Sequence, residues 1–83
     1  MKTPETIIKE YVRRLSEDEI NFLNPRFNQL LFGDRADIVD LLSKDKHIDK
    51  LLASASDATQ WFDLLEAIGN AVKKEYEHRF VKV

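Results

Sequence analysis

The sequence predicts an all-α fold: a compact orthogonal array of five to six short helices with a longer C-terminal helix, in one domain spanning residues 1–83. Apolar residues recur along the whole chain at the three- and four-residue spacing of amphipathic helices. Two glycines and two prolines are too few for the tight turns of a sheet-rich fold. Short helices joined by short turns do not build an up-down bundle of equal members, so we expect steep crossings around one long helix.

The first helix is expected to begin at Pro4, because Thr3 is a good N-cap and proline is well tolerated at the first helical position. Its apolar face covers an arc of roughly 140°. The residues of this face are Ile7, Ile8, Tyr11, Val12 and Leu15. A second helix is expected after Ser16, since Ser16 and Glu19 have the spacing of a capping box.

Three further helix starts are expected in the middle of the chain. Asn24 followed by Pro25 repeats the start signal of the first helix, so the second helix is expected to end there and a third to begin. Gly33 is expected to end the third helix as a left-handed C-cap, and Asp34 to cap a fourth. Asp45 is expected to cap a fifth helix.

The last helix is expected to run from about Asp57 to about His78, with an apolar arc of roughly 180°. Its apolar residues are Trp61, Phe62, Leu64, Leu65, Ile68, Val72 and Tyr76. Gly69 lies inside this arc, and because glycine costs about 1 kcal/mol in a helix interior, we expect a neighbouring backbone to approach closely there. Glu75 and Arg79 form an i,i+4 pair in the favourable order.

Composition excludes several classes of protein. The absence of cysteine excludes disulfide scaffolds, thiolate zinc sites, thiol nucleophiles and cysteine-bound iron–sulfur clusters. No apolar run approaches the roughly 20 residues of a membrane span, and the first residues lack a secretory signal, so we expect a cytoplasmic protein without a membrane partner. No glycine-rich phosphate loop or serine nucleophile motif is present, so we expect no enzymatic activity and no cofactor.

Two groups of residues resemble fragments of metal sites. Asp34, Asp37 and Asp40 share one side of a helix, and Glu75 with His78 forms a Glu-x-x-His sequence. Neither group has the second set of ligands that a metal site needs, so we interpret them as capping and solvated charges and expect no bound metal. A small metal-assisted enzyme is the third hypothesis for the chain.

The net charge of −2 is the sum of regions with opposite charge. Residues 1–15 and 70–83 each carry a net +2, whereas residues 16–69 carry −6. If the first and last helices are neighbours, their basic side chains form a patch that could bind nucleic acid through its phosphates. The candidates are Arg13, Arg14, Lys73 and Lys74, and the alternative is that they are ordinary solvated charges interleaved with glutamates.

Aromatic side chains are numerous for so small a core. Trp61 and Phe62 are adjacent, so they point about 100° apart and cannot both face the core. Exposed aromatic side chains commonly mark protein interfaces, although short helices crossing at steep angles can also bury more than one face. The leading hypothesis is therefore a small non-enzymatic helical protein–protein interaction module, a regulator or adaptor that binds another protein or itself. Nucleic-acid binding is the alternative. The expected interface residues are Phe32, Trp61, Phe62 and Phe80.

Overall fold

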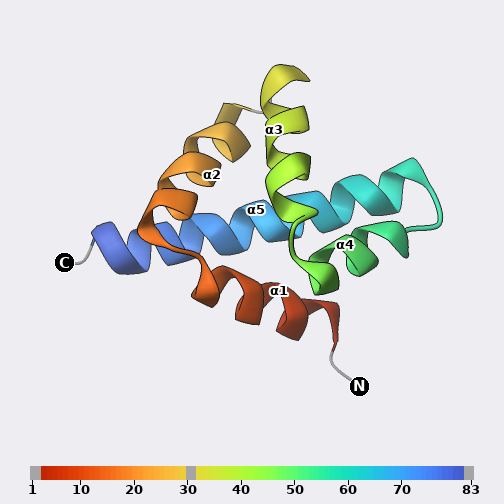
Figure 1. Ribbon diagram of the computed structural model, residues 1–83, viewed down its shortest axis with the longest axis horizontal. Coiled ribbons are helices and arrows are strands. Elements are labelled where there is room, and N and C mark those ends of the chain that lie inside the picture. The colour runs from red at the N-terminus through yellow and green to blue at the C-terminus, as the bar shows by residue number, and fades with distance from the viewer. Residues whose placement is uncertain (1–2, 30–31, 82–83) are drawn as a thin grey trace.

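Five α-helices make up the described part of the chain, residues 3–29 and 32–81, in the computed structural model (Figure 1). Side chains are described for residues 3–28 and 35–81. The helices are α1 (Pro4–Arg14), α2 (Glu17–Gln29), α3 (Phe32–Leu42), α4 (Lys46–Ala53) and α5 (Ala58–Phe80). Since α5 has 23 residues and the others have 8 to 13, the predicted all-α array with a longer C-terminal helix is confirmed.

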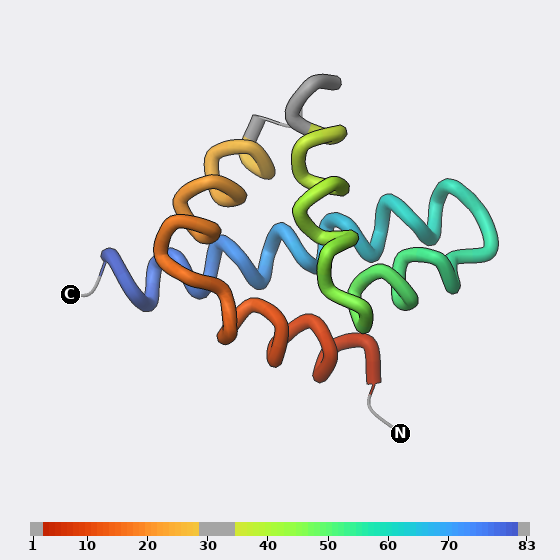
Figure 2. The backbone as a smooth tube through the Cα atoms, viewed as in Figure 1, coloured from red at the N-terminus to blue at the C-terminus, as the bar shows by residue number. Residues whose placement is uncertain are grey.

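The long helix α5 crosses the molecule and receives α1, α2 and α4 against its sides, while α3 packs against α2. The chain crosses along α1, rises through α2, descends through α3 and returns through α4 into α5 (Figure 2). Both α1 and α5 run from right to left in this view. The C-terminal ends of these two helices therefore lie close together, although they are far apart in the sequence.

All five helices contribute to one hydrophobic core. Seven of its side chains are almost completely excluded from water: Ile20, Leu23, Ile38, Leu42, Ile48, Ile68 and Val72. Burying a side chain of this size contributes about 1.5 to 3 kcal/mol. Among the described side chains, no polar or charged residue is buried in this core. The polar interactions that position the helices therefore lie around the edge of the core.

Four of the predicted helix starts are confirmed. The Thr3 hydroxyl accepts a hydrogen bond from the Thr6 amide, and the Asp45 and Asp57 carboxylates cap α4 and α5 in the same way. The predicted capping box is also formed, because the Glu19 amide donates to the Ser16 hydroxyl at 3.2 Å and the Ser16 amide donates to the Glu19 carboxylate at 2.9 Å. These contacts join residues two or three positions apart, so a local sequence pattern is sufficient to predict them.

The predicted break at Asn24 and Pro25 is wrong, because α2 continues through the proline. An interior proline costs a helix about 3 kcal/mol. Here Leu23 and Phe27 lie one turn apart on either side of the proline, and both are buried in the core. An uninterrupted helix places both side chains on its inner face, and their burial offsets the cost of the proline, which itself faces solvent.

Arg26 supports the turn around this proline. Its guanidinium donates a hydrogen bond to the Phe22 carbonyl at 2.9 Å and lies over the Phe22 ring at 3.7 Å from the ring centre. The same side chain lies 3.8 Å from the Asp37 carboxylate of α3. Arg26 therefore links α2 to the next helix.

The predicted roles of Gly33 and Asp34 are wrong as well, because both residues belong to α3 and neither caps a helix. Of the separate helix expected between Pro25 and Gly33, residues 25–29 belong to α2, and Phe32 belongs to α3. An aspartate in the first turn of a helix interacts favourably with the helix dipole, as it does at the N-cap, so the two positions share one sequence signal. Because three of the expected helices are replaced by two, α2 and α3, the described part of the chain has five helices.

The close approach predicted at Gly69 is confirmed, but the approaching group is different. The nearest atom to a Cβ built at this position is Cδ1 of the Phe27 ring, at 2.7 Å. A side chain of α2, and not a backbone, therefore occupies the space that the glycine leaves open.

Candidate functional site

A groove with a volume of about 860 Å³ lies between α1 and α5. Its base is apolar and is formed by Ile8 and Val12 from α1 with Ala67 and Ala71 from α5. The side chains of Ile8 and Val12 are only 4% and 2% exposed, so they belong to the core and only their edges border the groove. Binding clefts in proteins commonly have volumes of about 300 to 1,000 Å³, and this groove falls within that range.

Charged side chains line the two sides of the groove. Lys9 and Arg13 come from α1, and Lys74 comes from α5. Two carboxylates, those of Glu5 and Glu75, also line it. Glu5 lies in the first turn of α1 and Arg13 in its last turn, whereas Lys74 lies in the C-terminal half of α5.

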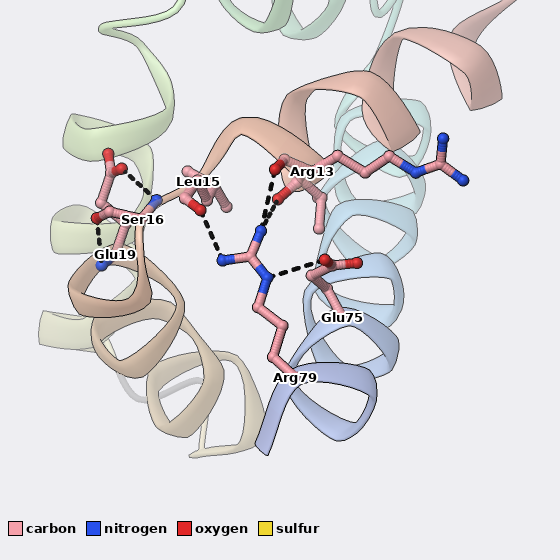
Figure 3. A network of polar contacts seen from close by, with 7 residues as sticks. Arg13, Leu15, Ser16, Glu19, Glu75 and Arg79 are labelled. Atoms are coloured by element: carbon pink, nitrogen blue, oxygen red, sulfur yellow. Dashed lines mark hydrogen bonds and ion pairs between the residues drawn. The ribbon is translucent and has the colours of Figure 1, made fainter. Parts of the chain in front are cut away.

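Arg79 joins the C-terminal end of α1 to α5 (Figure 3). Its Nη1 donates to the Leu15 carbonyl at 2.7 Å, and its Nη2 donates to the carbonyls of Arg13 at 3.0 Å and Val12 at 3.4 Å. Its Nε donates to the Glu75 carboxylate at 2.9 Å, as the i,i+4 spacing predicts. The last carbonyls of a helix have no partner within the helix, so Arg79 acts as a C-cap of α1 provided by a distant part of the chain.

This network determines which charges of the groove remain available. Glu75 is paired with Arg79 and does not compensate another cation to the same extent. The Arg13 guanidinium points away from Arg79 (Figure 3). Among the described residues, the side chains of Lys9, Arg13 and Lys74 form no ion pair or hydrogen bond. The groove therefore presents three cations without an ion pair to any described residue, and the likewise unpaired carboxylate of Glu5, beside an apolar base.

The structure separates the four basic residues that the sequence suggested for nucleic-acid binding. Arg13 and Lys74 line the groove. Arg14 is directed toward α4, where its guanidinium lies 3.5 Å from the Asp45 carboxylate. Lys73 is exposed on α5 and does not line the groove. Two of the four residues are therefore brought together.

Sequence reasoning did not identify the groove itself. A usable signal was present, because Glu5, Lys9 and Arg13 recur every four residues and therefore share one side of α1. Ala67 and Ala71 have the same spacing on α5. The pattern becomes informative only when the two helices are known to be neighbours.

Two of the expected interface aromatics are exposed. Phe62 is 45% and Phe80 is 39% exposed. Trp61 is half-buried against the core, and its ring contacts that of Phe62 edge-on, with 5.1 Å between ring centres. The Phe80 ring lies 5.1 Å from that of Tyr76. The side chain of Phe32 lies outside the described residues.

These exposed aromatics do not form one surface. Phe62 and Phe80 are 18 residues apart, which is five full turns, so they lie on the same side of α5 at a separation of about 27 Å. Gly69 lies on that side between them, and Phe27 of α2 covers it. Neither Phe62 nor Phe80 lines the groove between α1 and α5.

A second, smaller groove of about 330 Å³ lies between α2 and α3. Its charged lining residues are Asp18, Glu19, Asp37, Asp40 and Lys44. Of the aspartates that resembled a metal site, Asp37 and Asp40 are thus in this groove, and the side chain of Asp34 is outside the described part of the chain. Within residues 3–28 and 35–81, no three histidine, aspartate or glutamate side chains are placed to hold a metal ion together.

None of the helices in the described ranges combines the length and the apolar character needed to cross a membrane. Comparison of the chain with protein-family models, with curated proteins and with solved structures finds no match. The geometry of the groove between α1 and α5 is therefore the basis for a functional assignment.

Proposed function

We propose that this chain is a non-enzymatic helical protein–protein interaction module, a regulator or adaptor that receives a segment of a partner protein in the groove between α1 and α5. The observation that carries the proposal is the combination, in one groove, of an apolar base with three cations that form no ion pair within the described part of the chain. Protein interfaces commonly combine an apolar centre with a polar rim in this way.

The base of the groove suits close contact with another chain. Ala67 and Ala71 lie one turn apart on α5, and their small side chains allow a partner to approach the helix backbone. Ile8 and Val12 have the same spacing on α1 and lie at the base of the groove, where only their edges are exposed. Two parallel rows of apolar residues favour an elongated occupant over a compact small molecule.

The charged rim supports recognition. Exposed charges around an interface contribute little to affinity individually, but they accelerate association and select the orientation of the partner. The positions of Lys9 and Arg13 on one side of the groove and of Lys74 on the other support this role.

A photo-crosslinking residue substituted for Ala67 tests the proposal in extracts of the native host. We expect one discrete crosslinked protein from this position and none from a control position at Ala53, which is exposed on α4 outside the groove. A second variant, Ala67→Trp, fills the groove and is expected to abolish binding of the crosslinked protein, whereas Ala53→Trp preserves it. Equal crosslinking from both positions, or binding that survives Ala67→Trp in a folded protein, contradicts the proposal.

Self-association is tested separately. The exposed Phe62, Phe80 and Val81 provide apolar surface at the two ends of α5. Sedimentation velocity over a range of concentrations reports whether copies of the chain associate, and Phe62→Ser and Phe80→Ser show which end takes part. A monomer at all concentrations restricts the proposal to binding of another protein.

Nucleic-acid binding is the second candidate, and the observation in its favour is that α1 and α5 are neighbours and place Arg13 and Lys74 in one groove. Glu5 in the same groove and the net charge of −2 act against it. If the candidate is correct, duplex or single-stranded oligonucleotides bind at low salt. Arg13→Gln with Lys74→Gln then reduces the number of counterions released on binding, measured from the salt dependence of the affinity, by about two. The matched control is Lys46→Gln with Lys50→Gln on α4, and absence of binding at low salt rejects the candidate.

A further inference from the structure

We infer that the occupant of the groove between α1 and α5 is an acidic, amphipathic helical segment of a partner protein. The inference rests on the proposed function, since it assumes that the groove is an interaction site. It adds the chemistry and the orientation of the partner.

The first step is the origin of the uncompensated charge. In many helices, basic residues of the last turn interact with the free carbonyls there. At the end of α1, the carbonyls of Val12, Arg13 and the C-cap residue Leu15 accept hydrogen bonds from Arg79. The Arg13 side chain is therefore not needed at the end of its own helix and extends away from it (Figure 3).

The second step concerns the carboxylate at the same end of the groove. Glu75 lines the groove together with Arg13 and Lys74. Its carboxylate is instead bound to the Arg79 guanidinium at 2.9 Å. The contact that caps α1 therefore also engages a carboxylate that lines this groove.

The other carboxylate of the groove, that of Glu5, lies toward the N-terminal end of α1. Glu5 is one turn from Lys9, although the described contacts include no ion pair between the two. Glu5 and Arg13 are eight positions apart, which is about 12 Å along the helix axis, so Glu5 is too distant to compensate Arg13. Arg13 and Lys74 therefore form no ion pair with either carboxylate of the groove.

The third step is the nature of the occupant. The apolar base runs along two neighbouring helices, with Ile8 and Val12 on one and Ala67 and Ala71 on the other. A helix with apolar residues at i, i+3, i+4 and i+7 can lie in a groove of this kind. A phosphate backbone makes no use of an apolar base, and residues 16–69, with a net charge of −6, repel a long polyanion. The observations therefore favour a protein segment.

Charge complementarity also defines the orientation. Carboxylates of the segment are expected beside Arg13 and Lys74, toward the C-terminal ends of α1 and α5. Glu5 at the other end of the groove disfavours an acidic residue there. The segment is thus expected to carry its acidic residues toward one end.

The test uses two synthetic amphipathic helical peptides with the same leucine stripe, one with three glutamates at one end and one with glutamines in their place. Binding is measured by calorimetry and by the shifts of backbone amide signals. We expect the glutamate peptide to perturb signals of α1 and α5 and to bind on the order of tenfold more tightly at low salt. High salt is expected to reduce this advantage.

Charge variants test whether the tighter binding of the glutamate peptide depends on the cations of the groove. Lys9→Gln, Arg13→Gln and Lys74→Gln together are expected to remove it. The matched control, Lys46→Gln, Lys50→Gln and Lys73→Gln, makes the same change in net charge at exposed positions outside the groove and is expected to preserve it.

The outcomes separate this inference from the proposed function. Equal binding of both peptides that is lost in Ala67→Trp overturns the acidic occupant and leaves the groove as an interaction site. Binding that persists in a folded Ala67→Trp variant overturns both. Absence of binding by either peptide, or tighter binding of a duplex oligonucleotide through the same three cations, also overturns the acidic segment.

Discussion

The Cδ1 atom of Phe27 lies 2.7 Å from the point that a Cβ atom would occupy at Gly69, and two further ring atoms lie within 3.2 Å of it. Non-bonded carbon atoms are in favourable contact at about 3.5 to 4.0 Å, so a side chain at this position would overlap the ring. Gly69 therefore allows α2 and α5 to pack as closely as they do.

Gly69→Ala is expected to destabilise the protein by about 1 to 3 kcal/mol, because the overlap with Phe27 outweighs the gain of about 1 kcal/mol in helix propensity. Urea unfolding measures the change. Asn70→Ala, at the next and exposed position of α5, is the control and is expected to be neutral or stabilising. Phe27→Leu removes the ring that the new methyl group would overlap. The double variant Gly69→Ala with Phe27→Leu is therefore expected to be less destabilised than the sum of the two single changes. A more stable Gly69→Ala protein contradicts the role of the contact.

Arg79→Met is expected to destabilise the protein by about 2 kcal/mol, because the last carbonyls of α1 lose their donor and Glu75 loses its partner. Arg79→Lys is expected to recover only part of the loss, since an ammonium group cannot reproduce the planar arrangement of donors. The control is Arg13→Gln, whose side chain is exposed, and a change within about 0.5 kcal/mol is expected there. Unfolding in urea distinguishes these variants, and an Arg79→Met protein as stable as the parent excludes the capping role.

The raised pKa of Tyr11 leads us to expect a loss of stability at alkaline pH. Burial, together with the nearby carboxylates of Glu19 and Asp45, raises the pKa of Tyr11 from 10.0 to about 12, and Arg14 acts in the opposite direction. Below pH 10 the hydroxyl is protonated in both the folded and the unfolded chain. Between about pH 10 and pH 12 the unfolded chain releases this proton first, so the free energy of unfolding falls by on the order of 2 kcal/mol.

The measurement is the difference in stability between the parent and Tyr11→Phe across this range, because lysines titrate in both proteins and cancel in the comparison. We expect the parent to lose more stability than the variant between pH 10 and pH 12. Parallel curves would show that ionisation of Tyr11 is not linked to unfolding.

Asp45 allows the capping and ion-pair contributions to be separated. Its carboxylate accepts hydrogen bonds from the amides of His47 at 2.9 Å and Ile48 at 3.1 Å, and it lies 3.5 Å from Arg14. Asp45→Ala is expected to cost about 1 kcal/mol, because the N-cap is lost. Asp45→Asn retains a capping oxygen and is expected to cost less than about 0.5 kcal/mol, because Arg14 is 60% exposed and surface ion pairs are weak. Equal losses in thermal or urea unfolding would assign the effect to the ion pair instead.

The helix starts show how much a local pattern can predict. The caps at Thr3, Ser16, Asp45 and Asp57 each depend on one side chain and an amide two or three residues later, so no other part of the chain is needed to form them. The pair of Glu75 and Arg79 is local in the same sense. These predictions are confirmed for that reason.

The amino-acid sequence by itself determined the helical class, the long last helix and most helix starts, because these depend on spacing and on contacts within one turn. Tertiary structure alone decided that α2 continues through Pro25, since the burial of Leu23 and Phe27 against other helices offsets the cost of the proline. It also decided that Arg79 caps α1 and that Arg13 and Lys74 share a groove. Those contacts join residues more than 60 positions apart, and their formation depends on the packing of whole helices, which no local pattern contains.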